Sequence, residues 1–78
     1  MSEPAVYDLK GLKCPLPVLK TRRRLAGMVA GAELRVETTD PLAVIDIPHF
    51  CREDGHDLLE ATRTDDGHRF LIRKGPDR

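Results

Sequence analysis

The spacing of apolar residues divides the first half of the chain into a strand, a helix and a second strand. Residues 5–9 form a short, mainly apolar run before Gly11, and residues 34–38 alternate apolar and polar side chains, which is the period of a half-buried strand. Between them, residues 15–30 carry apolar side chains at helical spacing. Those apolar residues are Val18, Leu19, Leu25, Ala26 and Val29, and Gly27 and Gly31 weaken the end of the helix.

A second helix is predicted over residues 42–52. Asp40 and Pro41 are the residue types that favour a helix N-cap and the first helical position. Pro48 lies inside this segment and has no backbone N–H, so we expect it to kink or shorten the helix. Gly55 marks the helix end.

Two further strands complete the pattern. Residues 56–64 and 68–74 are strand-like, and the intervening Asp65-Asp66-Gly67 favours a hairpin turn. The element order is therefore βαβαββ, and its first βαβ unit predicts a right-handed crossover with parallel strands. The expected fold class is α/β, a two-layer sandwich with two helices packed on one face of a four-stranded mixed sheet. At 78 residues, the chain is expected to form one domain over residues 1–78.

Composition excludes several kinds of function. The formal net charge is +0 and only 4% of residues are aromatic, so we expect no direct nucleic-acid binding. Residues 1–4 lack the basic and apolar regions of a signal peptide, and no apolar run approaches the length of a transmembrane helix. These features predict a cytoplasmic protein that does not associate with membranes. The small size and balanced charge favour a monomer.

Charge is nevertheless distributed unevenly along the chain. Residues 1–32 contain six cationic side chains against two acidic ones, whereas residues 33–66 contain ten acidic residues and three arginines. The cations of the first part are Lys10, Lys13, Lys20, Arg22, Arg23 and Arg24. We expect them to make the surroundings of Cys14 basic, which would favour thiolate formation and attract acidic partners. Taken alone, Arg22–Arg24 are more typical of an ordinary solvated helix face.

Cys14 is the strongest candidate for chemistry. It lies in the run Gly-Leu-Lys-Cys-Pro-Leu-Pro over residues 11–17, where the first strand gives way to the first helix. A cysteine at a helix N-cap faces backbone N–H groups and the positive end of the helix dipole, and both favour the thiolate. A structural, buried cysteine is the alternative interpretation.

The two prolines of this run restrict the backbone and limit the stabilisation of a thiolate. Pro15 and Pro17 fix their own φ angles and restrain the preceding residues, so they should hold the sulfur in one exposed direction. Neither has an N–H, which leaves only those of Leu16 and Val18 to reach the sulfur. We therefore predict a modestly lowered thiol pKa for Cys14.

Cys51 has three interpretations: a disulfide partner of Cys14, a metal ligand with Cys14, His49 and His56, or a packed residue at the end of the second helix. His49 and Cys51 are two positions apart on a predicted helix, so they should point to nearly opposite sides. Their spacing matches no common zinc pattern, and we predict neither a metal nor another cofactor. A packed position is favoured for Cys51, and the chain contains no glycine-rich phosphate loop or Ser-His-acid set.

Residues 8–74 resemble the TusA-like (SirA-like) sulfur carriers. Cys14-Pro15-Leu16-Pro17 matches the Cys-Pro-x-Pro signature of that family, with Asp8 and Gly11 in register. Further matches are Asp40-Pro41, Asp46-Ile47-Pro48-x-Phe50-Cys51, His56-x-Leu58 and Leu71-Ile72-Arg73-Lys74. Leu16 stands where TusA proteins often have Glu, a departure that bears on the choice of partner.

The resemblance implies a two-layer α/β sandwich and a role in sulfur relay. In the family, a cysteine desulfurase passes persulfide sulfur to the motif cysteine, which passes it to a downstream acceptor protein. The routes include 2-thiouridine synthesis in tRNA, molybdenum-cofactor assembly and sulfur oxidation. Carried over, Cys14 would bear the persulfide as a relay rather than as a stand-alone catalyst. Gly11, Pro15 and Pro17 would be its scaffold, and Lys13 and Asp40 are candidate partner contacts.

Two functions of other classes stay open at this point. The protein could be a thiol redox protein in which Cys14 and Cys51 form a reversible disulfide. It could also be a non-catalytic interaction or regulatory module that uses the basic face of its first helix. Modification of both thiols under mild oxidant would favour the redox protein, and partner binding that survives Cys14→Ala would favour the module.

Overall fold

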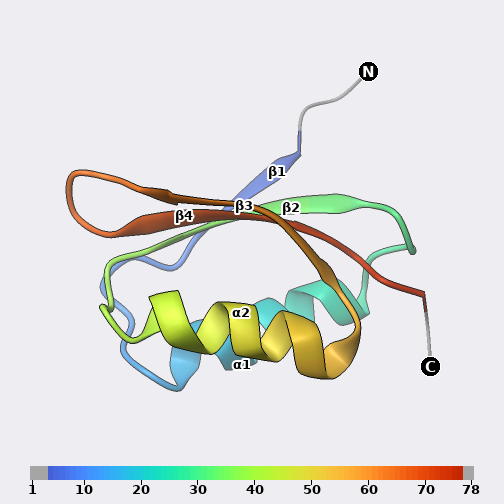
Figure 1. Cartoon of the computed structure of the whole chain (residues 1–78), viewed down its shortest axis with the longest axis horizontal. Coiled ribbons are helices and arrows are strands. Elements are labelled where there is room, and N and C mark those ends of the chain that lie inside the picture. The colour runs from blue at the N-terminus through green and yellow to red at the C-terminus, as the bar shows by residue number, and fades with distance from the viewer. Residues whose placement is uncertain (1–3, 77–78) are drawn as a thin grey trace.

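Two helices lie against one face of a four-stranded sheet in the computed structural model, which describes residues 4–76 (Figure 1). The element order is βαβαββ, as predicted. The elements are β1 (Ala5–Asp8), α1 (Leu16–Ala26), β2 (Glu33–Thr38), α2 (Ala43–Asp54), β3 (Asp57–Arg63) and β4 (His68–Arg73). No helix within residues 4–76 is long and apolar enough to cross a membrane.

The sheet is mixed and has the strand order β1-β2-β4-β3. β1 pairs with β2 in parallel, while β4 is antiparallel to both of its neighbours. The parallel pair follows from the βαβ connection through α1, and the antiparallel pair β3–β4 follows from the short hairpin. The predicted two-layer fold class is confirmed.

The core lies between the inner strands and the two helices. In β2, Leu34 and Val36 are fully buried, and they pair in register with Ile72 and Phe70 of β4. Intervening residues of β2 are half-buried, so the predicted alternation is confirmed. The helices contribute Leu25, Ala43, Ile47, Phe50 and Cys51 to the same cluster. This packing holds α1 and α2 side by side over β2 and β4.

The first helix is shorter than predicted, and its predicted apolar face is confirmed only in part, at Leu25 and Val18. It ends at Ala26, where the N–H of Gly27 donates to the Arg24 carbonyl, and Val29 beyond it is 76% exposed. The buried residues of α1 are Pro17, Thr21 and Leu25. Thr and Pro do not count as apolar in a periodicity pattern, so the predicted face was rotated toward Leu19, which is exposed.

The second helix begins one residue later and ends two residues later than predicted. It starts at Ala43, and Leu42 rather than Asp40 occupies the N-cap. Pro48 was expected to kink or shorten the helix; it does not shorten it, because α2 continues to Asp54 and ends at Gly55 in the left-handed conformation. Buried side chains on both sides of Pro48, at Ile47 and Phe50, hold both parts of the helix against the sheet.

Candidate thiol site

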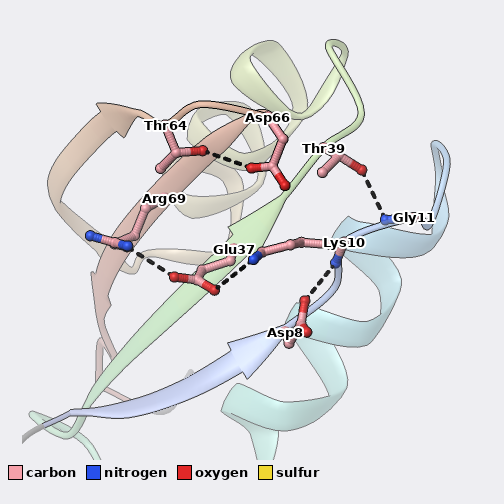
Figure 2. Close-up of polar contacts among 8 residues, drawn as sticks. All are labelled: Asp8, Lys10, Gly11, Glu37, Thr39, Thr64, Asp66 and Arg69. Carbon is pink, nitrogen blue, oxygen red and sulfur yellow. Dashed lines mark hydrogen bonds and ion pairs between the residues drawn. The ribbon is translucent and has the colours of Figure 1, made fainter.

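The loop between β1 and α1 carries Cys14 and is tied to the end of β2. The N–H of Gly11 donates to the Thr39 hydroxyl at 2.8 Å, and the N–H of Lys10 donates to the Asp8 carboxylate at 3.0 Å (Figure 2). Gly11 has a φ of +86°, a conformation that residues with a Cβ rarely adopt. Gly11, a predicted scaffold residue, thus forms the turn that brings the chain back toward β2.

Lys10, one of the predicted cations near Cys14, is directed to the sheet instead. Its ammonium lies 3.7 Å from the Glu37 carboxylate, which also accepts a hydrogen bond from Arg69 at 3.1 Å (Figure 2). This row of alternating charges crosses from the loop over β2 to β4. These ion pairs fix the loop. They also engage the positive charge of Lys10, which was predicted to lie near the Cys14 thiol.

Cys14 lies one residue before the helix cap, not at the N-cap as predicted. Pro15 is the N-cap of α1, and the Cys14–Pro15 peptide bond is cis. The N–H of Leu16, one of the two donors expected to reach the sulfur, donates to the Lys13 carbonyl at 2.8 Å. The thiol itself is exposed, as the prolines suggested. Lys13, the neighbouring candidate partner contact, is also exposed.

The backbone of Cys14 is held by Asp40, which lies just before α2. The Cys14 N–H donates to one oxygen of the Asp40 carboxylate at 2.6 Å, and the Leu42 N–H donates to the other at 3.2 Å. The Asp40 carbonyl accepts the N–H of Ala43 at 3.0 Å. Asp40 is thus more than a helix-start residue, because its side chain joins the chain segments that precede α1 and α2.

The sulfur of Cys14 contacts a second carboxylate, that of Asp46, which was not among the predicted site residues. Its S–H donates to the Oδ2 atom of Asp46, in the first turn of α2, at 2.9 Å. This hydrogen bond, some burial, and the negative charges of Asp46 and Asp40 all raise the pKa of the Cys14 thiol above its ordinary value. The predicted lowering of the pKa is therefore wrong in sign.

Two of the cations of α1, Arg22 and Arg24, are engaged with other side chains. The Arg22 guanidinium donates to the Asp54 carboxylate at 3.1 Å and lies over the Phe50 ring, 5.2 Å from its centroid. The Arg24 guanidinium lies 5.0 Å from the centroid of the Tyr7 ring. The surroundings of Cys14 are therefore acidic at close range, although the N-terminal part of the chain is basic.

A groove of about 620 Å³ opens beside the sulfur, between α1 and α2. Cys14, Pro15, Val18 and Phe50 line part of it, and the remaining lining side chains are charged or titratable. The Cys14 sulfur lies at a groove open to solvent, so a second sulfur atom or a partner's side chain has room beside it. The predicted scaffold residue Pro15 forms one wall, and Pro17 is buried in α1.

Cys51 is in a different environment from Cys14. It is 2% exposed in the core, and the structure shows both cysteines as free thiols. Burial, with the charges of Asp54 and Asp57, raises the pKa of the Cys51 thiol to about 11. The favoured interpretation of Cys51 as a packed residue is confirmed.

His49 and Cys51 point to different sides of α2, as their spacing predicted. The His49 ring is exposed and lies 3.7 Å from the Glu53 carboxylate, whereas the Cys51 side chain faces the core. Within residues 4–76, no group of three or more His, Cys, Asp and Glu side chains could hold a metal ion. The site offers one usable sulfur and two carboxylates.

The fold and the site together define a small α/β thiol protein. Comparison with protein families matches residues 5–74 to the family described as Sulfurtransferase TusA. The chain therefore belongs to the TusA family of sulfur-carrying proteins.

Individual relatives agree with this assignment over most of the chain. YrkI of Bacillus subtilis is 39% identical over 75 residues, which are 96% of this chain and all of its own length. NMA0882 of Neisseria meningitidis is 48% identical over 66 residues, 85% of this chain and 89% of its own. Both are named "putative sulfur carrier protein". The sulfur carrier protein TusA of Allochromatium vinosum is 39% identical over 67 residues, 86% of this chain and 88% of its own.

Proposed function

We propose that this protein accepts persulfide sulfur from a cysteine desulfurase on Cys14 and relays it to a downstream acceptor protein. The observation that carries the proposal is the position of the Cys14 thiol: it is exposed, its backbone is fixed by Asp40, and it opens on a groove. The relatives named as sulfur carriers support the same role.

Transfer to Cys14 needs access and a defined line of approach. The Cys14 sulfur, once deprotonated, attacks the outer sulfur of the donor's persulfide. A sulfur–sulfur bond forms at Cys14 while the donor's own sulfur–sulfur bond breaks, and the donor leaves as a thiolate that takes up the proton. No net oxidation occurs. Delivery to the acceptor is the same reaction in the opposite role, so an exposed sulfur that is not enclosed by the protein suits both halves.

The surface around Cys14 is suited to protein partners. Leu16, the first residue of α1, and Leu42, the N-cap of α2, are both exposed. Ile45, next to Asp46, is 64% exposed. Apolar side chains around a polar reactive group are typical of protein contact surfaces. We place the relay in the cytoplasm, acting as a monomer, with tRNA 2-thiouridine synthesis or a related sulfur pathway as its destination. Direct nucleic-acid contact is not required.

Intact mass spectrometry after incubation with a cysteine desulfurase, pyridoxal phosphate and cysteine tests the proposal. Wild type should gain the mass of one sulfur atom, and dithiothreitol should remove it, because a persulfide is reducible and a sulfinate of similar mass is not. Cys14→Ser should gain nothing. The matched control, Cys51→Ala, should load like wild type because Cys51 is buried. Equal loss of loading in both folded variants would overturn the assignment to Cys14.

A further inference from the structure

The hydrogen bond between Cys14 and Asp46 exists for only one state of the sulfur. A carboxylate accepts hydrogen bonds, so the 2.9 Å contact requires that the thiol keep its proton. Activated cysteines usually face a cation or free backbone N–H groups, which stabilise the thiolate. Here the nearest side chain favours the neutral thiol instead. The unloaded sulfur is therefore retained against α2 as a protonated donor.

The other charged groups around the groove do not reverse this effect. The groups facing it are Arg22 from α1 and Asp46, His49, Glu53 and Asp54 from α2. Asp40, from the loop before α2, contacts the backbone of Cys14. Arg22 is bound to Asp54, and His49 lies beside Glu53. Asp40 adds a second negative charge, which also raises the pKa of the Cys14 thiol. The local field therefore disfavours any anion at the position of the sulfur.

The contact with Asp46 depends on the proton of the Cys14 sulfur and on the absence of charge there, and loading with sulfur changes both. The product is a perthiol, in which the inner sulfur atom has no proton. The outer S–H of a perthiol is a stronger acid than a thiol, so the loaded group is anionic under conditions in which the thiol is neutral. A perthiolate cannot donate to Asp46, and it is repelled by the same carboxylate that held the thiol.

We propose that Asp46 acts as a charge switch that retains the unloaded thiol of Cys14 in the groove and repels the loaded perthiolate toward the partner. The inference rests on the proposed function, because it concerns the sulfur that the carrier bears. Asp46 touches the reacting sulfur, so its role in the transfer is direct. In the loading step it receives the proton of Cys14 and passes it to the departing thiolate of the donor. The sulfur–sulfur bonds exchange as described above, with no net oxidation.

The unloaded protein gives the first test. The rate of Cys14 alkylation by iodoacetamide is measured against pH for wild type, Asp46→Asn and Glu60→Gln, with the modified cysteine identified by mass spectrometry. Glu60→Gln removes one negative charge from β3, at the sheet edge opposite β1, and serves as the matched control. The midpoint of the curve of alkylation rate against pH should move to lower pH in Asp46→Asn alone. An Asp46→Asn midpoint equal to that of wild type would overturn the proposal.

The loaded protein gives the second test, and mass spectrometry separates alkylated persulfide from alkylated thiol. In wild type, the ratio of persulfide to thiol alkylation rates should be larger than in Asp46→Asn, whose amide can donate to a perthiolate and retain it. Equal ratios would overturn the switch. If wild type never gains sulfur, the proposed function is overturned instead. The alkylation rate of unloaded Cys14 against pH can still be measured in that case. If circular dichroism shows that Asp46→Asn is unfolded, Asp46→Ala must show the same shift of the midpoint.

Discussion

The Asp40 carboxylate accepts hydrogen bonds from the Cys14 N–H at 2.6 Å and the Leu42 N–H at 3.2 Å. Cys14 lies in the loop before α1, whereas Leu42 is the N-cap of α2. One side chain therefore sets the position of the reactive loop relative to the start of α2. The arrangement explains why Cys14 reaches Asp46 although the two residues are 32 positions apart. It also gives Asp40 a role in stability as well as in the field around the thiol.

Removal of the Asp40 side chain should lower the free energy of unfolding. Asp40→Ala leaves the N–H groups of Cys14 and Leu42 without their acceptor, which we expect to cost about 1–2 kcal/mol. Asp40→Asn keeps one acceptor oxygen and should cost less. Urea denaturation followed by circular dichroism measures both values. A stability of Asp40→Ala equal to that of wild type would show that the bridge contributes nothing in solution.

Cys51 should make the protein less stable in alkali. Its thiol pKa is about 11 in the folded protein and near 9.0 in an unfolded chain, so the folded state binds more protons between these values. The contribution of the neutral Cys51 thiol to the free energy of unfolding is therefore complete below about pH 9. It is lost as the pH rises toward 11, with a slope of at most about 1.4 kcal/mol per pH unit.

The Cys51→Ala variant isolates this effect from other groups that titrate in alkali. Urea unfolding of wild type and Cys51→Ala is compared at about pH 8 and about pH 10.5, a range that spans the expected loss. The difference in unfolding free energy between the two pH values should be smaller in Cys51→Ala. An identical pH dependence in both proteins would contradict the raised pKa of Cys51.

Two glycines should respond very differently to substitution by alanine. A Cβ at Gly11 would meet no atom within 4 Å, so Gly11→Ala carries only the cost of a positive φ, about 1–2 kcal/mol. A Cβ at Gly67 would overlap the backbone carbonyl of Thr38, which cannot move without disturbing β2. Thermal unfolding should therefore show a larger loss for Gly67→Ala. Similar losses would indicate that the β3–β4 turn adapts more easily than its contacts suggest.

The strands were predictable because the sheet imposes its own period on them. β2 has neighbours on both sides and one face against the helices, so its side chains alternate in burial and the sequence carries that alternation. The helix faces were less predictable. Thr21 is fully buried in α1 although its residue type is polar, and Leu19 is exposed although it is apolar. Which side of α1 faces the sheet depends on packing that residue types alone do not encode.

The site was predictable only to the extent that it is local. Cys14 stands out because prolines restrain the chain around it, and that conclusion needs only neighbouring residues. The sign of its pKa shift depends on Asp46, which reaches the sulfur through the packing of α2 beside α1. Within the sequence, Asp46 belongs to a matching segment of the family resemblance but has no local feature that marks it as a partner of Cys14.

The long separation between Cys14 and its two carboxylates has a consequence for how the protein can be observed. Asp40 and Asp46 influence the thiol only while α2 is docked beside α1, so the chemical behaviour of the sulfur is a property of the whole fold. A short peptide containing residues 11–17 would carry an ordinary cysteine. The alkylation rate of Cys14 thus doubles as a reporter of native structure, readable at a single atom while the chain unfolds and refolds.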